Sequence, residues 1–215
     1  MRKTIVIIFG APGSGKGFLV DCIENELENR NIVKKENIGH ISTGDLLRAE
    51  IAAQTPLGQE IAQIVSSGGL VSDEIVSKLI EKSLDGPEVL KFLDGYPRTE
   101  AQRLTLAGLL DGKGYRVISI KRDTPLPLIL ERVSKRRVCQ DCKCTHSVDD
   151  GKCPRCGGQS IIRKDDAVIE NRLAEYENNT AGQWNFLALL SESMLKVDGA
   201  EDAVVAAKDI VTRYF

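Results

Sequence analysis

The chain has 215 residues, of which 42% are hydrophobic and 28% are charged, and its formal net charge is −2. This length suits one domain, or one domain with insertions, built on a single buried core. With this slightly acidic balance a general affinity for polyanions is not expected, so any affinity for phosphates has to be local. No signal peptide or membrane span is visible, and we therefore expect a cytoplasmic protein with no membrane partner.

The most informative stretch begins with the apolar, largely β-branched run Ile5–Phe9, which predicts a buried parallel strand. Apolar residues at helical spacing over residues 18–29 predict a helix. Between them, residues 10–16 read GAPGSGK and fit the phosphate-binding pattern G-x-x-x-x-G-K. The glycines let backbone N–H groups point into one concavity at the helix N-terminus, and the lysine adds a mobile positive charge. The sequence therefore predicts a site for nucleotide phosphates, formed by Gly13, Ser14, Gly15, Lys16 and Gly17.

The longer pattern G-x-P-G-x-G-K-G, residues 10–17, resembles the nucleoside monophosphate kinases. That family usually has Thr at the next position, where this chain has Phe18. Phe18 nevertheless falls within the ATP-binding segment that the resemblance implies. Gly17 stands where other phosphate loops have a Ser or Thr that ligates magnesium. We therefore expect Mg²⁺ to be held mainly by phosphates, water and a carboxylate elsewhere.

Two further segments resemble adenylate kinases in particular. After an expected strand over residues 38–42, the sequence STGDLLR (42–48) caps a helix and resembles the family's AMP-binding opening. The resemblance implies that Thr43 contacts the nucleotide and that Arg48 holds its phosphate. Gly69 and Val71 lie in a G-x-L-V-[ST]-D segment, whose backbone lines the adenine of AMP. The resemblance implies that residues 43–72 form a helical AMP-binding insertion.

An expected strand over residues 89–94 ends in Asp94 and is followed by GYPRT. A carboxylate at the carboxyl end of a buried strand can hold magnesium-bound water opposite the glycine loop. The pattern D-G-[FY]-P-R-T resembles the same family, which implies that Gly95 and Arg98 contact AMP and that Gln102 reads its base. Arg98 follows a Gly and a Pro that fix its direction, and it can clamp a phosphate with two hydrogen bonds.

Several arginines match the phosphate-binding arginines of the family. A predicted helix over residues 125–133 runs into ERVSKRR (131–137), where Arg132 and Arg136 match the arginines that grip ATP. Arg163, in the sequence RKDD, and Arg172, in the sequence RL, match two more, although the gap between Asp166 and Arg172 is shorter than usual. The resemblance implies a catalytic set of Lys16, Arg98, Arg132, Arg136, Arg163 and Arg172, with Arg163 and Arg172 also contacting AMP.

The composition changes abruptly at residue 139, where two C-x-x-C knuckles begin. Their four thiolates can complete one tetrahedral site, and disulfides are rare in a cytoplasmic chain. A flap of about 25 residues cannot bury a core of its own, so a metal cross-link makes physical sense. The spacing therefore predicts a structural Zn²⁺, with iron left open, on Cys139, Cys142, Cys153 and Cys156. One bacterial type of adenylate kinase carries such a knuckle in the lid over ATP. Cys144 is a spare thiol beside it, and His146 is a weaker candidate for a contact with adenine.

The C-terminal part has a predicted helix continuing through Trp184 to Leu190, a last strand over residues 195–199 and a final helix over residues 203–214. Gly199 matches the backbone that faces the adenine of ATP. Together with a strand over residues 115–120, these elements predict an α/β fold: a doubly wound, parallel, five-stranded P-loop sheet with a helical AMP-binding insertion and a zinc-knuckle lid. The expected organisation is a core of residues 1–42, 73–135 and 164–215, an insertion over 43–72, and a lid over 136–163.

The resemblance covers nearly the whole chain and implies a reversible phosphoryl transfer from Mg-ATP to AMP that gives two ADP, carried out by a monomer. A kinase for another nucleoside monophosphate, or one that uses GTP, remains an alternative. A second alternative is a nucleotide-dependent zinc protein that binds nucleic acid. The acidic net charge and the lack of aromatic residues interleaved with the basic residues near the knuckle disfavour it.

Overall fold

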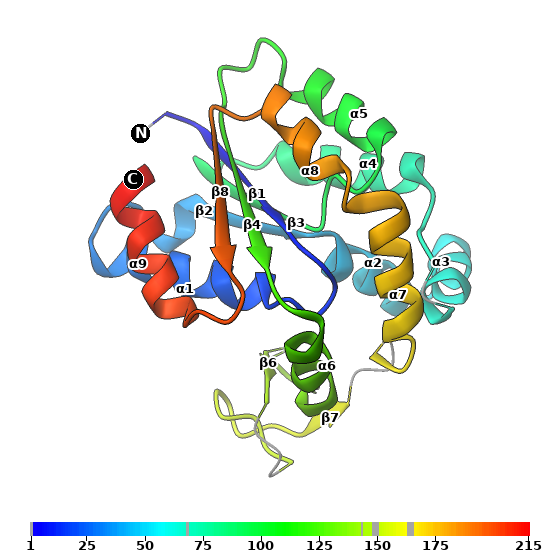
Figure 1. Cartoon of the computed structure of the whole chain (residues 1–215). Coiled ribbons are helices and arrows are strands. Elements are labelled where there is room, and N and C mark those ends of the chain that lie inside the picture. Colours follow the sequence, from blue (N-terminus) through cyan, green and yellow to red (C-terminus); the bar gives the residue numbers. More distant parts are fainter. Residues whose placement is uncertain (1, 68, 143, 148–150, 163–165) are drawn as a thin grey trace.

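The computed structural model describes residues 2–67, 69–142, 144–147, 151–162 and 166–215. Its centre is a five-stranded sheet in the order β2-β3-β1-β4-β8, in which every neighbouring pair is parallel (Figure 1). The strands are β1 (Thr4–Phe9), β2 (Ile38–Ser42), β3 (Leu90–Asp94), β4 (Arg116–Asp123) and β8 (Ser193–Asp198). The predicted five-stranded α/β fold is therefore confirmed. None of the described helices is long and apolar enough to cross a membrane.

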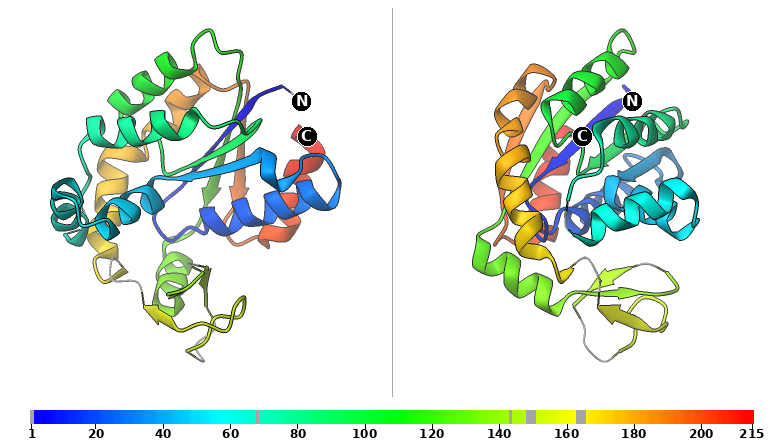
Figure 2. Two further views of the ribbon diagram at one scale, coloured as in Figure 1. Left: turned by 180° about the vertical axis from the view of Figure 1, so that it is seen from behind. Right: turned by 90° about the vertical axis from the view of Figure 1, so that its right-hand side faces the viewer.

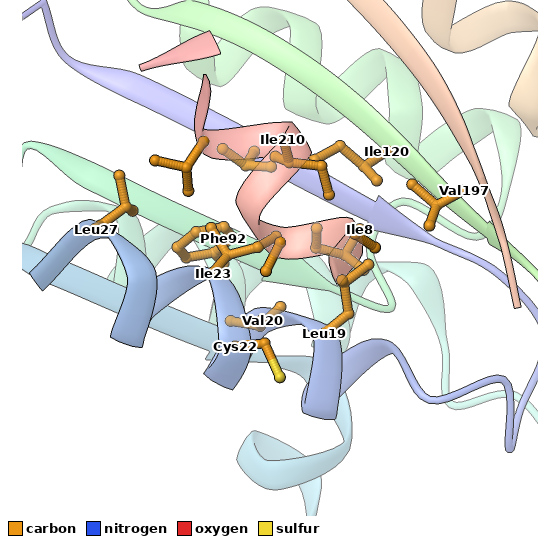
Figure 3. Close-up of a cluster of buried hydrophobic side chains, with 14 of the residues drawn as sticks. Ile8, Leu19, Val20, Cys22, Ile23, Leu27, Phe92, Ile120, Val197 and Ile210 are labelled. Carbon is orange, nitrogen blue, oxygen red and sulfur yellow. The ribbon is translucent and has the colours of Figure 1, made fainter. Parts of the chain in front are cut away.

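Helices cover both faces of the sheet because side chains alternate along each strand. Val6 and Ile8 of β1 face α1 (Lys16–Asn29) and α9 (Ala203–Tyr214), and Figure 3 shows α1 side chains meeting those of the strands and of α9. The alternate residues of β1, Ile5, Ile7 and Phe9, face the other way, toward α4 (Asp73–Leu84) and α5 (Glu100–Leu110). All six residues of β1 are buried, as expected for a central strand covered on both sides.

Two helices connect β2 to α4, and each begins at a side-chain cap. The Ser42 hydroxyl accepts the N–H of Asp45 at the start of α2 (Thr43–Ala52), and the Thr55 hydroxyl accepts the N–H of Gly58 at the start of α3 (Pro56–Ser66). Figure 2 shows α2 and α3 standing to one side of the sheet. They project from the end of β2, at the same edge as the loop that follows β1.

A small antiparallel sheet in the order β6-β5-β7 follows α6 (Leu126–Lys135) and lies beyond the carboxyl ends of the large sheet (Figure 1). Its strands are β5 (Arg137–Cys139), β6 (Thr145–His146) and β7 (Ser160–Ile162). Few apolar side chains are available to such short strands, so this unit has little core of its own.

The chain between residues 169 and 190 differs from the single helix that the sequence predicts. It forms α7 (Ile169–Glu175), a π-helical turn over Tyr176–Thr180, α8 (Gln183–Phe186) and a 3₁₀ turn over Leu187–Leu189. The rings of Tyr176 and Trp184 both pack on Phe9, with centroid separations of 6.0 and 5.7 Å. Residues eight apart point about 80° apart on a regular α-helix, so the widened turn lets both rings reach one strand residue.

The strand predicted over residues 115–120 is also longer than expected, because β4 extends to Asp123. Its polar end, Lys121–Asp123, is paired with β8 in the parallel ladder. Backbone pairing with an edge strand therefore extends β4 beyond its apolar segment, which is the only part that a hydrophobic pattern can reveal.

Candidate functional site

The glycine-rich loop after β1 has the backbone geometry that its sequence predicts. Gly13 and Gly15 have φ angles of +80° and +88°, values that L-residues with side chains rarely adopt. Gly13 also has no room for a side chain, since an added Cβ would lie 2.7 Å from Val133 and 2.9 Å from Ile129 of α6. The loop therefore curls against α6 and leads directly into the N-terminus of α1.

Lys16 is the first residue of α1, and its ammonium group turns back over the loop. Its Nζ donates to the carbonyl oxygens of Gly10 at 3.0 Å and Ala11 at 3.1 Å. It also lies 4.0 Å from Oδ1 of Asp94. This proximity follows from the sheet, because Asp94 ends β3 and is paired with Ile8 of β1.

Asp94 is a largely buried carboxylate with two basic neighbours, Lys16 and His40. Its Oδ2 lies 3.9 Å from Nε2 of His40, which comes from β2. Burial by itself raises the pKa of Asp94, but the imidazole of His40 and the ammonium of Lys16 outweigh burial and bring the pKa below its usual value. Asp94 is therefore a charged acceptor at the carboxyl end of the sheet, where ligands of α/β proteins bind.

The pKa of Lys16 is lowered to about 8, chiefly by burial, and Asp94 only partly opposes this shift. Three guanidinium groups lower the pKa of Lys16 further: those of Arg98, Arg172 and Arg136. The four cations come from α1, from the loop after β3, from α7 and from the residue after α6. Such a convergence of positive charges is costly unless an anion neutralises it, so the arrangement favours a multiply charged anion such as a polyphosphate.

A cavity of about 1160 Å³ opens beside these cations and is bounded by α2, α3, the phosphate loop and the small antiparallel sheet. Its volume exceeds the upper end, about 1000 Å³, of the range typical for a single small ligand. It brings together residues that are distant in the sequence. The predicted nucleotide-binding residues that line it are Lys16, Thr43, Arg48, Gly69, Val71, Gly95, Arg98, Gln102 and Arg172, and the predicted metal ligand Cys139 lines it as well.

Within the cavity the polar side chains are held by nearby groups. The Thr43 hydroxyl donates to the carbonyl oxygen of Gly95 at 3.1 Å, and Nε of Arg98 donates to the same oxygen at 2.8 Å. Arg48 is half exposed and donates to Oδ1 of Asp45 at 2.6 Å. Because Arg98 is bonded to a neutral carbonyl, its positive charge remains available to a ligand.

Arg132 lies outside the lining of this cavity and joins two loops instead. One guanidinium nitrogen donates to the carbonyl oxygen of Ser14 at 3.1 Å, and another donates to the carbonyl oxygen of Gly199 at 2.8 Å. Gly199 packs so closely on Thr124 that an added Cβ would overlap it. Arg132 thus links the phosphate loop to the turn after β8.

Phe18, on the first turn of α1, leaves 60% of its surface exposed.

Arg122, which no sequence motif singles out, has a buried side chain that bonds to the Gly199 turn. Its guanidinium donates to the carbonyl oxygens of Gly199 at 3.2 Å and Glu201 at 2.5 Å. Burial lowers the pKa of Arg122, and neighbouring Arg132 lowers it further. No sequence signal predicts this burial, because Arg122 lies beyond the strand predicted over residues 115–120 and arginines are more often exposed.

Arg136 and Arg172 meet at one buried carboxylate. Arg136 makes two hydrogen bonds to Asp166, through Nε at 2.8 Å and through a terminal nitrogen. Arg172 Nη1 lies 3.8 Å from the same carboxylate, and Arg172 lines the large cavity despite the short gap that precedes it. Arg163, which the sequence also predicts here, lies outside the described residues.

The four predicted metal-binding cysteines form one cluster in which all four sulfurs lie within 4.8 Å of one another. Tetrahedral zinc with bonds of about 2.3 Å separates its sulfurs by about 3.8 Å. The Cys139–Cys156 and Cys142–Cys153 sulfurs are 3.5 and 3.6 Å apart. The backbone N–H of Arg155 also points at Sγ of Cys153. The donor set and its spacing are therefore compatible with a structural zinc site.

The remaining cysteines and His146 have other surroundings. Cys144 lies outside the four-sulfur cluster, although its carbonyl oxygen accepts the N–H of Cys139. Cys22 belongs to the core between α1 and α9. His146 bonds through Nε2 to the Ser160 hydroxyl at 2.7 Å and does not line the large cavity.

Comparisons with known proteins identify the chain's relatives. A family model described as adenylate kinase matches residues 8–187. The adenylate kinase of Carboxydothermus hydrogenoformans is 36% identical over 208 residues, covering 91% of this chain and 92% of the relative. Those of Kosmotoga olearia and Moorella thermoacetica are 33% and 35% identical, covering 95% and 91% of this chain and 96% and 91% of the relatives. The chain belongs to the adenylate kinase family.

Proposed function

We propose that this chain transfers the γ-phosphoryl group of ATP to AMP, reversibly, to give two ADP. The observation that carries this assignment is the meeting of Lys16 with three guanidiniums beside a cavity of about 1160 Å³, because the reaction joins two phosphate chains end to end. Membership of the adenylate kinase family supports the same reaction. A kinase with another acceptor or with GTP as donor is not favoured by these relatives.

On the donor side, the phosphate loop and Lys16 bind the β- and γ-phosphates of ATP. Arg132 and Gly199 form part of the site for the rest of ATP. Arg132 joins the phosphate loop to the Gly199 turn through hydrogen bonds to the carbonyl oxygens of Ser14 and Gly199. Phe18, on the first turn of α1, is exposed and belongs to the same ATP-binding segment. The donor residues are Gly13, Ser14, Gly15, Lys16, Gly17, Phe18, Arg132, Arg136 and Gly199.

On the acceptor side, the large cavity takes AMP. Arg48 and Arg98 hold its phosphate, since a guanidinium can form two parallel bonds to a phosphate group. Thr43 and Gln102 provide polar contacts, and backbone at Gly69, Val71 and Gly95 lines the nucleotide.

Transfer requires no covalent enzyme intermediate. An AMP phosphate oxygen is ionised near neutral pH, so it attacks the γ-phosphorus of ATP without a general base. The new P–O bond forms in line with the bond between the γ-phosphorus and the β–γ bridging oxygen. That bond breaks, and the bridging oxygen leaves as part of ADP. Lys16, Arg98, Arg136 and Arg172, together with Arg163, stabilise the negative charge on the moving group.

Mg²⁺ arrives with ATP and neutralises part of the phosphate charge when bound. The residues fit this ion, because Asp94 is charged and lies beside the phosphate loop, and a Cβ at Gly17 would lie 3.7 Å from Asp94 Oδ2. Asp94 would hold the ion through water.

We further propose that residues 43–72 and 136–163 act as two flaps on a core of residues 1–42, 73–135 and 164–215. Closing both excludes water, which would otherwise accept the phosphoryl group. A Zn²⁺ on Cys139, Cys142, Cys153 and Cys156 cross-links the second flap, and all four ligands are protein thiolates, so its role is structural.

Replacing Lys16 or Arg98 with alanine tests the central assignment. We expect each variant to lose turnover by about 10³-fold or more, because each removes a charge that faces the transferred group. A coupled assay with ATP, AMP and magnesium measures this, and Arg213→Ala on the exposed face of α9 is the control. Near-normal turnover in either variant, with the fold intact by circular dichroism, would contradict the role in transfer of the residue that it replaces.

The pKa of Lys16 predicts how ATP binding depends on pH. In the free protein this pKa is about 8, and bound phosphates raise it because they stabilise the charged form. Binding therefore takes up a proton above pH 8, and the Kd for ATP should rise on the order of tenfold from pH 7 to pH 9. Calorimetry measures this change, and Lys16→Met should bind weakly with little dependence on pH. An equal Kd at both pH values in the unsubstituted protein would show that Lys16 is charged throughout.

Metal removal tests the knuckle. We expect one zinc per chain by elemental analysis, and a chelator or Cys142→Ser should lower the Tm by about 5 °C or more, because the small sheet has little core without its cross-link. Cys144→Ser is the matched control and should keep the metal, since its sulfur lies outside the cluster. Reduced, intact protein without bound metal would rule the site out, and iron in place of zinc would correct the identity of the ion.

Phe18→Thr tests the position where this chain departs from its family. A hydroxyl on the first turn of α1 can donate to a phosphate oxygen, so the KM for ATP should fall by about threefold to tenfold. Phe18→Leu serves as the control, since it shortens the side chain without adding a donor. An unchanged or higher KM for ATP in Phe18→Thr would show that the position makes no phosphate contact.

A further inference from the structure

The side-chain amide of Gln102 is held at both ends, although it lines the acceptor cavity. Its Oε1 accepts the backbone N–H of Arg98 at 2.8 Å, and its Nε2 donates to Oδ1 of Asp73 at 2.8 Å. Gln102 is 2% exposed, so these bonds form away from bulk water. A turned amide would place its oxygen against the carboxylate and its NH₂ group against a backbone N–H, and both contacts are repulsive.

Asp73 is the group that makes this orientation unique, because a carboxylate can only accept hydrogen bonds. It is the first residue of α4, and its second oxygen accepts the Thr99 hydroxyl at 2.7 Å. Thr99 caps α5 and accepts the backbone N–H of Gln102. The Tyr96 hydroxyl donates to the carbonyl oxygen of Gln102 at 3.1 Å. Asp73 thus ties α4 to the start of α5, and the backbone of Gln102 is fixed as firmly as its side chain.

Two bonding positions of the Gln102 amide are not used by these contacts: one N–H and one lone pair of Oε1. Adenine offers an amino donor beside a ring-nitrogen acceptor, and a glutamine amide can bind both at once. A 6-oxopurine offers an oxygen acceptor beside an N–H donor, which is the reverse order. Only the turned amide matches it, and Asp73 excludes the turned amide.

We propose that Asp73 is a positioning residue that makes the acceptor site select a 6-aminopurine over a 6-oxopurine monophosphate by fixing the amide of Gln102. This inference rests on the proposed function, which places the acceptor nucleotide in the cavity that Gln102 lines. Asp73 acts through Gln102 and not by touching the base.

The test compares AMP and IMP as acceptors, at saturating ATP, in the unsubstituted enzyme and in Asp73→Asn. An asparagine can either accept from or donate to Gln102, so it permits both orientations of the amide. We expect the ratio of kcat/KM for AMP to that for IMP to fall about tenfold, the discrimination of a single two-bond contact. The kcat for AMP should stay within twofold and the KM for ATP should not change.

Glu74→Gln is the matched control, because it removes the same charge from the neighbouring residue, whose side chain is 78% exposed. It should leave the AMP-to-IMP ratio unchanged. If Asp73→Asn is too unstable to assay, Asp73→Ser offers a hydroxyl that also donates or accepts and should relax the ratio in the same way. An unchanged ratio in a folded Asp73 variant, or an equal change in Glu74→Gln, would overturn the proposal. Failure of the unsubstituted enzyme to use ATP and AMP would instead overturn the proposed function.

Discussion

The structure depends on bringing several positive charges together without fully neutralising them. Burial and three guanidiniums lower the pKa of Lys16 from 10.5 to about 8, which corresponds to about 3 kcal/mol against its charged form. Asp94 and Asp166 are the carboxylates that the described residues place beside these cations. A polyphosphate brings more negative charge than these two residues supply. Its binding therefore removes a repulsion that the fold maintains in the free protein.

Backbone carbonyls make this possible, because they hold cations without cancelling their charge. Lys16 bonds to the carbonyl oxygens of Gly10 and Ala11, and Arg98 bonds to that of Gly95. These oxygens belong to the loops that follow two adjacent strands, β1 and β3. The parallel sheet thus sets both the direction of the cations and their distance from one another. Burial of β1 on both faces keeps the phosphate loop in place relative to Asp94, because a shift of the strand would move the loop.

Most of the fold and part of the site could be predicted from the sequence because the relevant signals are local. The apolar run before the glycines predicts β1, and the glycine spacing predicts the loop. The spacing of the four cysteines predicts their cluster. Contacts between distant residues could not be predicted in this way. The bond between Asp73 and Gln102 joins residues 29 positions apart, and the burial of Arg122 depends on a turn 77 positions away. The π-helical turn at Tyr176 depends on packing against Phe9, which no local period encodes.

The cations divide into two groups according to the partners that orient them. Arg98 is held by a carbonyl, so its guanidinium is already directed and charged when AMP arrives. Arg136 makes two bonds to the buried carboxylate of Asp166, which is the same geometry that it would use for a phosphoryl group. These two bonds use Nε and Nη2, so they do not occupy Nη1, which can donate to a phosphoryl oxygen while Asp166 holds the opposite edge of the guanidinium. A carbonyl therefore orients Arg98 and a carboxylate orients Arg136, and each guanidinium keeps donors for phosphate oxygens.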